Sequence, residues 1–306
     1  MAQDKPTRRS HVVPRAYLQG FADGKNQLTC LRRDKSSQYA LSTSDASVIR
    51  DFYALPGHPV RIDAFEQTLG RFEAEFPKWR AQLENRQVLS GVDRLTMAGF
   101  LAFQVLRGKA FFDAASATEQ NDVPRIVAQL SPLEMQDWLL HQGHHFSIDG
   151  AIEVQRCILN GEIELELGST AFVQHIDREV SAVQGHLVAR KWQFVNFAED
   201  RLFTCDEPIS LLLNNAARST DVYLALQDNV EILMPISRSV GLRILGVYGD
   251  DLLGTGNGDH DEIFEGFHDE SKLFNNAMRT QAKSVLFAHP NDHALLYFNE
   301  SQTSAT

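Results

Sequence analysis

Two polar residues stand out in the otherwise apolar segment that begins at Gly99. Gln104 and Arg107 lie three residues apart, so in a helix their side chains project from neighbouring positions on one side. Arginine does not lose its charge in proteins, and a buried guanidinium needs acceptors. We therefore expect a carboxylate or a bound anion to meet Arg107 if this side of the helix is buried. A structural ion pair, with Gln104 as a bystander, is the alternative.

Glu66 and Glu73 are candidates for the carboxylates of such a site. They lie seven residues apart, along one side of a helix that the surrounding apolar spacing predicts. A helical hairpin joined near residues 82–91 would bring this side against Arg107. Two glutamates at this spacing could also share a metal ion or divide acid and base roles. Solvated surface glutamates are the alternative.

Asp206 is a second candidate partner for Arg107. It closes an apolar strand in Cys205-Asp206-Glu207-Pro208. The end of a strand holds a side chain in a fixed position, which suits a catalytic or binding residue. However, an Asp that precedes a turn often caps the next element, which is the structural alternative.

His11 opens the most distinctive stretch of the sequence. Pro14 follows it and suits the first turn of a helix, because its missing N–H would have no partner there. Tyr17 and Phe21, four residues apart, would share the apolar face of that helix. The stretch thus places a histidine and Arg15 around the start of a helix.

The elements that must position these residues are helical in the middle of the chain and strand-rich towards its end. The apolar run over Leu95–Phe112 predicts one central helix. Strands are predicted after the helices, at Trp192–Phe197, Arg201–Cys205, Val230–Met234 and Val240–Val247.

We therefore expect an α+β fold in a single compact domain over residues 1–300. The N-terminal motif and short strands occupy residues 10–56, and a helical region occupies residues 62–190. This region packs against a mixed or antiparallel sheet formed mainly by strands of residues 191–298. Residues 301–306 are expected to be a disordered tail.

The composition of the 306 residues indicates which classes of partner and which cellular compartment to expect. The net charge of −11 disfavours broad, sequence-blind binding to nucleic acid, because Lys and Arg drive phosphate binding. It leaves room for a local basic groove. No apolar run reaches the ~18 residues of a membrane span, and because residues 1–9 are polar and basic we do not expect a secretory signal. The three cysteines are far apart, so we expect a reducing cytoplasm and no cysteine-rich metal site.

Taken in order, these motifs resemble the bacterial DUF4238 family, proteins of unknown function. The stretch from His11 to Phe21 is similar to its opening His-aromatic-Val-Pro-x-x-Tyr-Leu-x-x-Phe block, and Gln104-x-x-Arg107 is similar to its Gln-x-x-Arg helix. Further similarities, which extend the resemblance to about residue 287, are Asp51-Phe52-Tyr53, Glu66, Asp206-x-Pro208, Met234-Pro235-Ile236-Ser237, and Asn275 or Asn276. In the turn at Asp206, Cys205 and Glu207 replace the Ser and Asn of the family pattern. The resemblance implies no established reaction.

Our first functional hypothesis is a hydrolase that acts on a phosphorylated or nucleic-acid substrate, such as a nucleotide. Its roles fall on seven residues: His11 as acid/base or metal ligand, Glu66 and Asp206 as carboxylates, Arg107 as anion clamp oriented by Gln104, and Arg15 and Asn275 as further substrate contacts. A histidine with two carboxylates and open water positions would suit Mg²⁺ or Mn²⁺.

The alternative is a non-catalytic binding or regulatory module, such as a defence- or toxin-associated protein. In that case His11, Gln104, Arg107 and Asp206 form a buried network that fixes the N-terminal segment to the helical core. Accessibility discriminates between the two hypotheses. An open pocket that exposes these groups favours chemistry, whereas a sealed and paired network favours a structural role.

Overall fold

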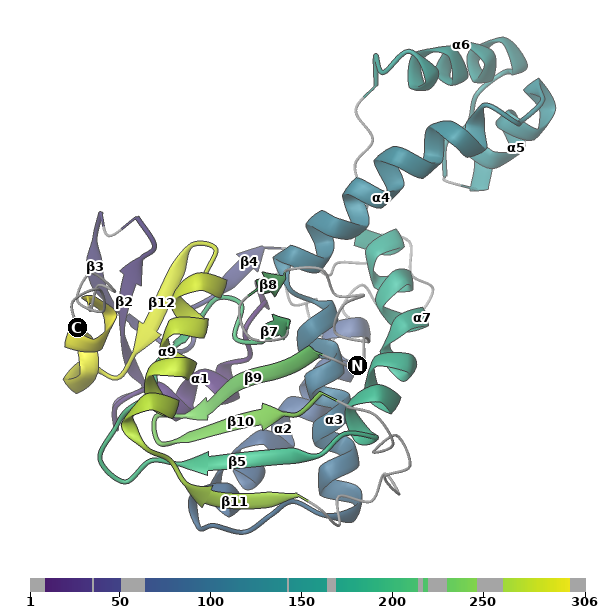
Figure 1. Ribbon diagram of the computed structural model, residues 1–306. Coiled ribbons are helices and arrows are strands. Elements are labelled where there is room, and N and C mark those ends of the chain that lie inside the picture. The colour runs from purple at the N-terminus through teal and green to yellow at the C-terminus, as the bar shows by residue number, and fades with distance from the viewer. Residues whose placement is uncertain are drawn as a thin grey trace, which may run out of the picture.

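The structure is a computed structural model that confirms the expected α+β class (Figure 1). It describes residues 9–34, 36–50, 64–141, 143–163, 169–213, 217–219, 230–246 and 261–297. The Asp51-Phe52-Tyr53 motif and the C-terminal residues 301–306 lie outside this part of the chain. None of the described helices is both long enough and apolar enough to cross a membrane.

The larger sheet consists of strands from the region after residue 191, as expected. Its strands are β5 (Trp192–Asn196), β7 (Ser210–Leu213), β8 (Ala217–Ser219), β9 (Val230–Ser237), β10 (Val240–Ile244) and β11 (Glu262–Glu265). Their order is β11-β5-β10-β9-β7-β8. Only the β11–β5 pair among these is parallel, so the sheet is mixed.

A second, antiparallel sheet joins the N-terminal strands to later ones. It contains β2 (Gln27–Arg32), β3 (Gln38–Ser42), β6 (Thr204–Cys205) and β12 (Val285–Ala288), in the order β3-β2-β12-β6. Two short strands, β1 (Arg9–His11) and β4 (Val48–Arg50), form a separate antiparallel pair in which His11 lies opposite Val48.

Helices cover both faces of the larger sheet (Figure 1). On one face lie α2 (Ala64–Glu84) and α3 (Gly91–Leu106), and α7 (Ser169–Val188) packs beside α3. Side chains of alternate β5 residues point to this face, where the amide of Asn196 donates to the carbonyl of Leu83 at 3.1 Å. On the opposite face α9 (His268–Gln281) places Phe274 directly over Gly241.

The short helical elements lie near the two ends of the chain. They are α1 (Arg15–Leu18) with the 3₁₀ turn η1 (Gln19–Phe21), and the 3₁₀ segment η3 (Pro290–Tyr297). Pro14 is the residue directly before α1, which agrees with the expected helix start. Tyr17 and Phe21 are both fully buried, and their ring centroids are 5.3 Å apart.

The single central helix expected over Leu95–Phe112 is wrong, because the structure has two helices there. α3 ends at Leu106, Arg107 has φ −96° and ψ −4°, and Gly108 is extended at φ −65° and ψ 155° before α4 (Lys109–Val127) begins. Apolar burial continues on both sides of this break, at Leu106 and Phe111. The hydrophobic pattern therefore does not reveal it. The break places Arg107 at a corner between two helices.

A helical arm projects from the body of the molecule (Figure 1). We use this name for the end of α4 from Val123 together with α5 (Pro132–His141) and α6 (Ile148–Leu159). The arm has a small core of its own, made by Val123, Val127, Met135, Leu139, Ala151 and Ile158. The amide of Gln155 ties α6 to the end of α4 by donating to the carbonyls of Val127 at 2.7 Å and Leu130 at 2.9 Å.

Candidate functional site

Arg107 lies at the corner between α3 and α4 and is almost completely buried, with 2% of its surface exposed. Its Nη1 is 2.9 Å from Oε1 of Glu73, and its Nε donates to Oε1 of Gln104 at 3.2 Å. Glu73 comes from α2, so the helical hairpin expected from the sequence brings its glutamate edge against α3. The acceptor that a buried guanidinium requires is thus a carboxylate of the protein itself.

Gln104 connects this ion pair to the N-terminal segment. It is buried, and its Nε2 donates to the carbonyl of Val12 at 3.4 Å. Val12 in turn donates its N–H to the carbonyl of Ser47 at 3.0 Å, and Val13 donates to the Ser47 hydroxyl at 3.1 Å. A continuous polar chain therefore runs from Glu73 through Arg107 and Gln104 to the backbone beside His11.

His11 lies next to this chain, in β1. The side chain is half-buried, and its Nε2 is 3.3 Å from the carbonyl oxygen of Ser44. This contact directs the imidazole towards the turn before β4. The same turn contacts the N-terminal segment through Ser47. The structure thus brings His11, Gln104 and Arg107 into one region, as the sequence predicts.

Glu207 is a neighbour of Arg107 that the sequence analysis missed. It is buried, with 7% of its surface exposed, and a Cβ placed on Gly108 would lie only 3.7 Å from its Cδ and Oε1. The signal was present in the sequence, because Glu207 is a second acidic residue that directly follows Asp206 at the end of the strand. Two carboxylates, those of Glu73 and Glu207, thus lie around the corner between α3 and α4.

Asp206 has a different role from the one proposed for it as a partner of Arg107. Its two carboxylate oxygens accept hydrogen bonds from the backbone N–H groups of Lys283, at 2.9 Å, and Ser284, at 2.7 Å. Burial raises the pKa of Asp206, and these backbone donors act in the opposite direction. Asp206 therefore fixes the turn between α9 and β12. This role is structural, but the turn it caps is distant in the sequence and is not the next element along the chain, which the sequence analysis had considered.

Asn275 also binds backbone groups. Its Oδ1 accepts from the N–H of Phe203 at 3.1 Å, and its Nδ2 donates to the carbonyl of Arg201 at 3.0 Å. The side chain therefore holds the segment before β6 against α9. Next to this segment, the Tyr17 hydroxyl lies 2.6 Å from that of Thr204, and burial raises the pKa of Tyr17 well above its ordinary value.

The two remaining predicted residues lie at the margin of the region. Arg15 is solvent-exposed at the start of α1. Glu66 lies in the first turn of α2, two helical turns before Glu73, and its side chain is outside the described part of the structure. The proposed role of Glu66 thus stays a prediction, whereas Glu73 has the contact with Arg107.

The described residues do not supply a metal site. Across the ranges given above, no three His, Cys, Asp or Glu side chains come close enough together to hold a metal ion. In particular, Asp206 is directed to backbone N–H groups. Asp206 therefore does not fit the Mg²⁺ or Mn²⁺ site considered from the sequence, and the side chain of Glu66 lies outside the described residues.

Comparison with known proteins gives a family but no characterised relative. The model of a family described as protein of unknown function, DUF4238, matches residues 9–292. No curated protein and no solved structure matches the chain.

Proposed function

The chain belongs to the DUF4238 family, and we propose, from the geometry around Arg107, that it is a non-catalytic binding or regulatory module. In this proposal, the network of Arg107, Gln104 and Glu73 fixes the N-terminal segment to the helical core. The single observation that carries the proposal is the burial of Arg107, which is 2% exposed, together with its ion pair to Glu73 at 2.9 Å. A scaffold of this kind holds a binding surface in a fixed position.

The electrostatics of the corner support this proposal over the hydrolase. An arginine that clamps a phosphate must present an unshared guanidinium edge to the substrate. Arg107 is only 2% exposed, and the Glu73 carboxylate balances its charge at 2.9 Å. Glu207 adds a second carboxylate beside Gly108. A bound anion would therefore have to displace Glu73 and would meet a negative neighbour.

The other predicted catalytic positions support the same proposal. The side chains of Asp206 and Asn275 both form hydrogen bonds with backbone groups. These backbone contacts already satisfy polar atoms of both side chains, so a structural role explains why polar residues stand at these two positions. The hydrolase hypothesis would need both residues to contact substrate in addition to, or in place of, these groups.

Hydrogen exchange of the full chain tests the structural role of the network. The variants Arg107→Met and Gln104→Met should increase amide exchange in residues 11–18, because the segment loses its link to α3. Lys78→Met is the matched control, since Lys78 also joins α2 to α3 through Asp93 but does so in an exposed ion pair. It should leave the exchange of residues 11–18 unchanged.

An activity measurement tests the hydrolase hypothesis directly. The wild-type protein is incubated with RNA, DNA and nucleotides, with and without Mg²⁺ or Mn²⁺, and no turnover is expected. Turnover by the wild type that disappears in a folded Arg107→Met variant would overturn the proposal in favour of the hydrolase. Unchanged exchange in both network variants would also contradict it.

A further inference from the structure

Exposed apolar side chains are concentrated on the helical arm and the residues that flank it. Among the described residues, most of the large apolar side chains that face solvent lie there. They are Ile126, Leu133, Leu140, Phe146, Ile148, Ile152, Leu159 and Ile163. A concentration of exposed apolar side chains on one part of a protein marks an interaction site more often than scattered single residues do.

On each of the two outer helices, these residues form a stripe. Leu133 and Leu140 are seven residues apart on α5, and Ile148, Ile152 and Leu159 recur at helical spacing on α6. The stripes are separate from the positions that form the small core of the arm. The amide of Gln136, on α5, donates to the carbonyl of Phe146 at 2.8 Å and so ties the start of α6 to α5.

The stripes are bordered by acidic side chains. Glu134 and Asp137 follow Leu133 on α5, and Asp149 and Glu153 accompany the stripe on α6. All four belong to solvent-exposed residues. Acidic residues outnumber basic ones in the arm, in line with the net charge of −11 of the whole chain. The surface of the arm is therefore apolar with a negative border.

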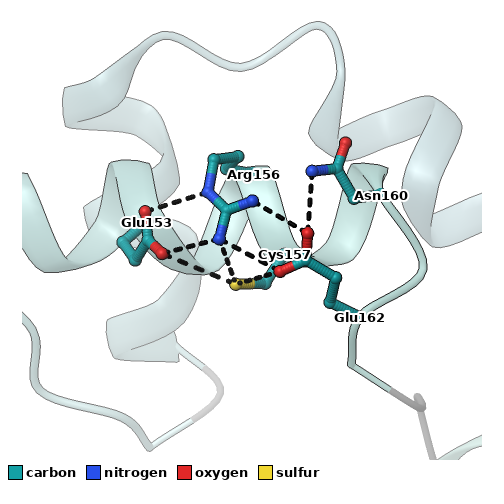
Figure 2. A network of polar contacts seen from close by, with 5 residues as sticks. All are labelled: Glu153, Arg156, Cys157, Asn160 and Glu162. Atoms are coloured by element: carbon teal, nitrogen blue, oxygen red, sulfur yellow. Dashed lines mark hydrogen bonds and ion pairs between the residues drawn. The ribbon is translucent and has the colours of Figure 1, made fainter.

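The basic residue of α6 does not offset this charge, because it is held between two glutamates (Figure 2). Nη2 of Arg156 is 2.8 Å from Oε1 of Glu153, and its Nη1 is 2.8 Å from Oε1 of Glu162. Asn160 donates to the same Glu162 oxygen at 3.0 Å. Together the three ionised side chains of this network carry one net negative charge.

We propose that the helical arm is the docking surface for a basic amphipathic helix of a partner protein. The inference rests on the proposed function as a binding module and names the chemistry of its partner. Apolar anchors of the partner, spaced at i, i+3 or i+4 and i+7, would lie on the stripes of α5 and α6, and its Lys and Arg residues would face the acidic border. The same border disfavours nucleic acid and anionic membranes, since both repel carboxylates.

The test measures binding of the full chain to a fluorescein-labelled helical peptide of Leu and Lys, by fluorescence anisotropy. Two peptides serve as controls, one with Glu in place of Lys and one with alternating Leu and Lys, which cannot form an apolar helix face. The wild type should bind the first peptide, bind both controls at least about tenfold more weakly, and lose affinity as salt is added.

Surface variants locate the binding. The double variant Leu133→Ser/Ile152→Ser should weaken binding by about tenfold, as for apolar contacts near an interface centre, and Glu134→Lys/Asp149→Lys should weaken it as well. Val92→Ser is the matched control, because Val92 is an apolar side chain of the body that is 79% exposed. It should bind like the wild type, and circular dichroism should show that all variants are folded.

Four outcomes would overturn the inference. These are no binding of the basic peptide by the wild type, equal binding of the acidic peptide, equal losses in Val92→Ser, and sedimentation of the wild type as a dimer that Ile152→Ser abolishes. The last outcome would assign the surface to a second copy of the chain. The hydrogen-exchange and turnover experiments on Arg107 report separately on the proposed function, so the two can fail independently.

Discussion

Arg94 and Asp261 form an ion pair whose side chains are 3% and 1% exposed, at the end of α3 opposite Arg107. Arg94 also donates to the carbonyls of Val188 at 2.9 Å and Arg190 at 2.8 Å, and its guanidinium lies 4.5 Å from the centre of the Trp192 ring. The helix α3 is therefore fixed at both ends by buried, paired arginines. One pair joins it to α7 and the larger sheet, and the other joins it to α2 and the N-terminal segment.

Removing Arg94 should strongly destabilise the protein. Arg94→Met leaves the Asp261 carboxylate buried without its cation, and we expect the free energy of unfolding to fall by about 3–5 kcal/mol. Urea denaturation measures this change. The control is Arg243→Met, which breaks a more exposed pair with Glu231, where the side chains are 34% and 20% exposed. Its loss should be well below that of Arg94→Met, and equal losses would contradict the assignment.

The pair of Arg107 and Glu73 should behave as a coupled unit. Arg107→Met leaves Glu73 without its cation and should cost about 3 kcal/mol or more, and Glu73→Gln leaves the buried guanidinium with a weaker acceptor. The double variant removes both charges of the pair. We therefore expect it to be less destabilised than the sum of the two single variants, as measured by a double-mutant cycle in urea. Strict additivity would show that the 2.9 Å contact has no energetic weight.

Gly241 should not tolerate a side chain. A Cβ there would lie 2.5 Å from Cζ and 2.7 Å from Cε2 of Phe274, so the ring of α9 would have to move. Gly241→Ala should lower the melting temperature and the free energy of unfolding, the latter by about 1–3 kcal/mol. Phe274→Leu in the same chain should relieve part of this clash. Gly185→Ala is the control, because that helical glycine has open space around it and alanine favours the helix.

The carboxyl group of Glu162 should titrate at unusually low pH. Hydrogen bonds from Arg156, and next from Asn160 and Cys157, lower its pKa from 4.5 to about 2. Because the pKa is lower in the folded state, the contribution to the stability of the arm is fully present above about pH 4.5 and is lost as the pH falls through about 2. An NMR titration of the carboxyl carbon measures this value. Arg156→Gln should return the pKa towards 4.5, and Arg125→Gln should leave it unchanged.

Local patterns in the sequence predict the class of the fold and part of the site. The apolar spacing around Glu73 predicts the helix and the face that meets Arg107, and the strand-rich end of the chain predicts the larger sheet. The break at Gly108 was not predictable from hydrophobicity, because buried residues continue through it. The role of Asp206 depends on the backbone of residues 283 and 284, far away in the sequence. Such contacts exist only after the chain has folded, and a single sequence carries no direct signal for them.

The position of β12 has a consequence for how the protein is made. This strand lies between β2 and β6, so an inner position of the second sheet is filled by residues 285–288, far along the chain from β2 at Gln27–Arg32. While the polypeptide is still being synthesised, β2 has an unpaired edge that only this late segment can cover. Folding intermediates on the ribosome will therefore present an open strand edge until residues 285–288 have been synthesised, and an open edge favours association with other nascent chains.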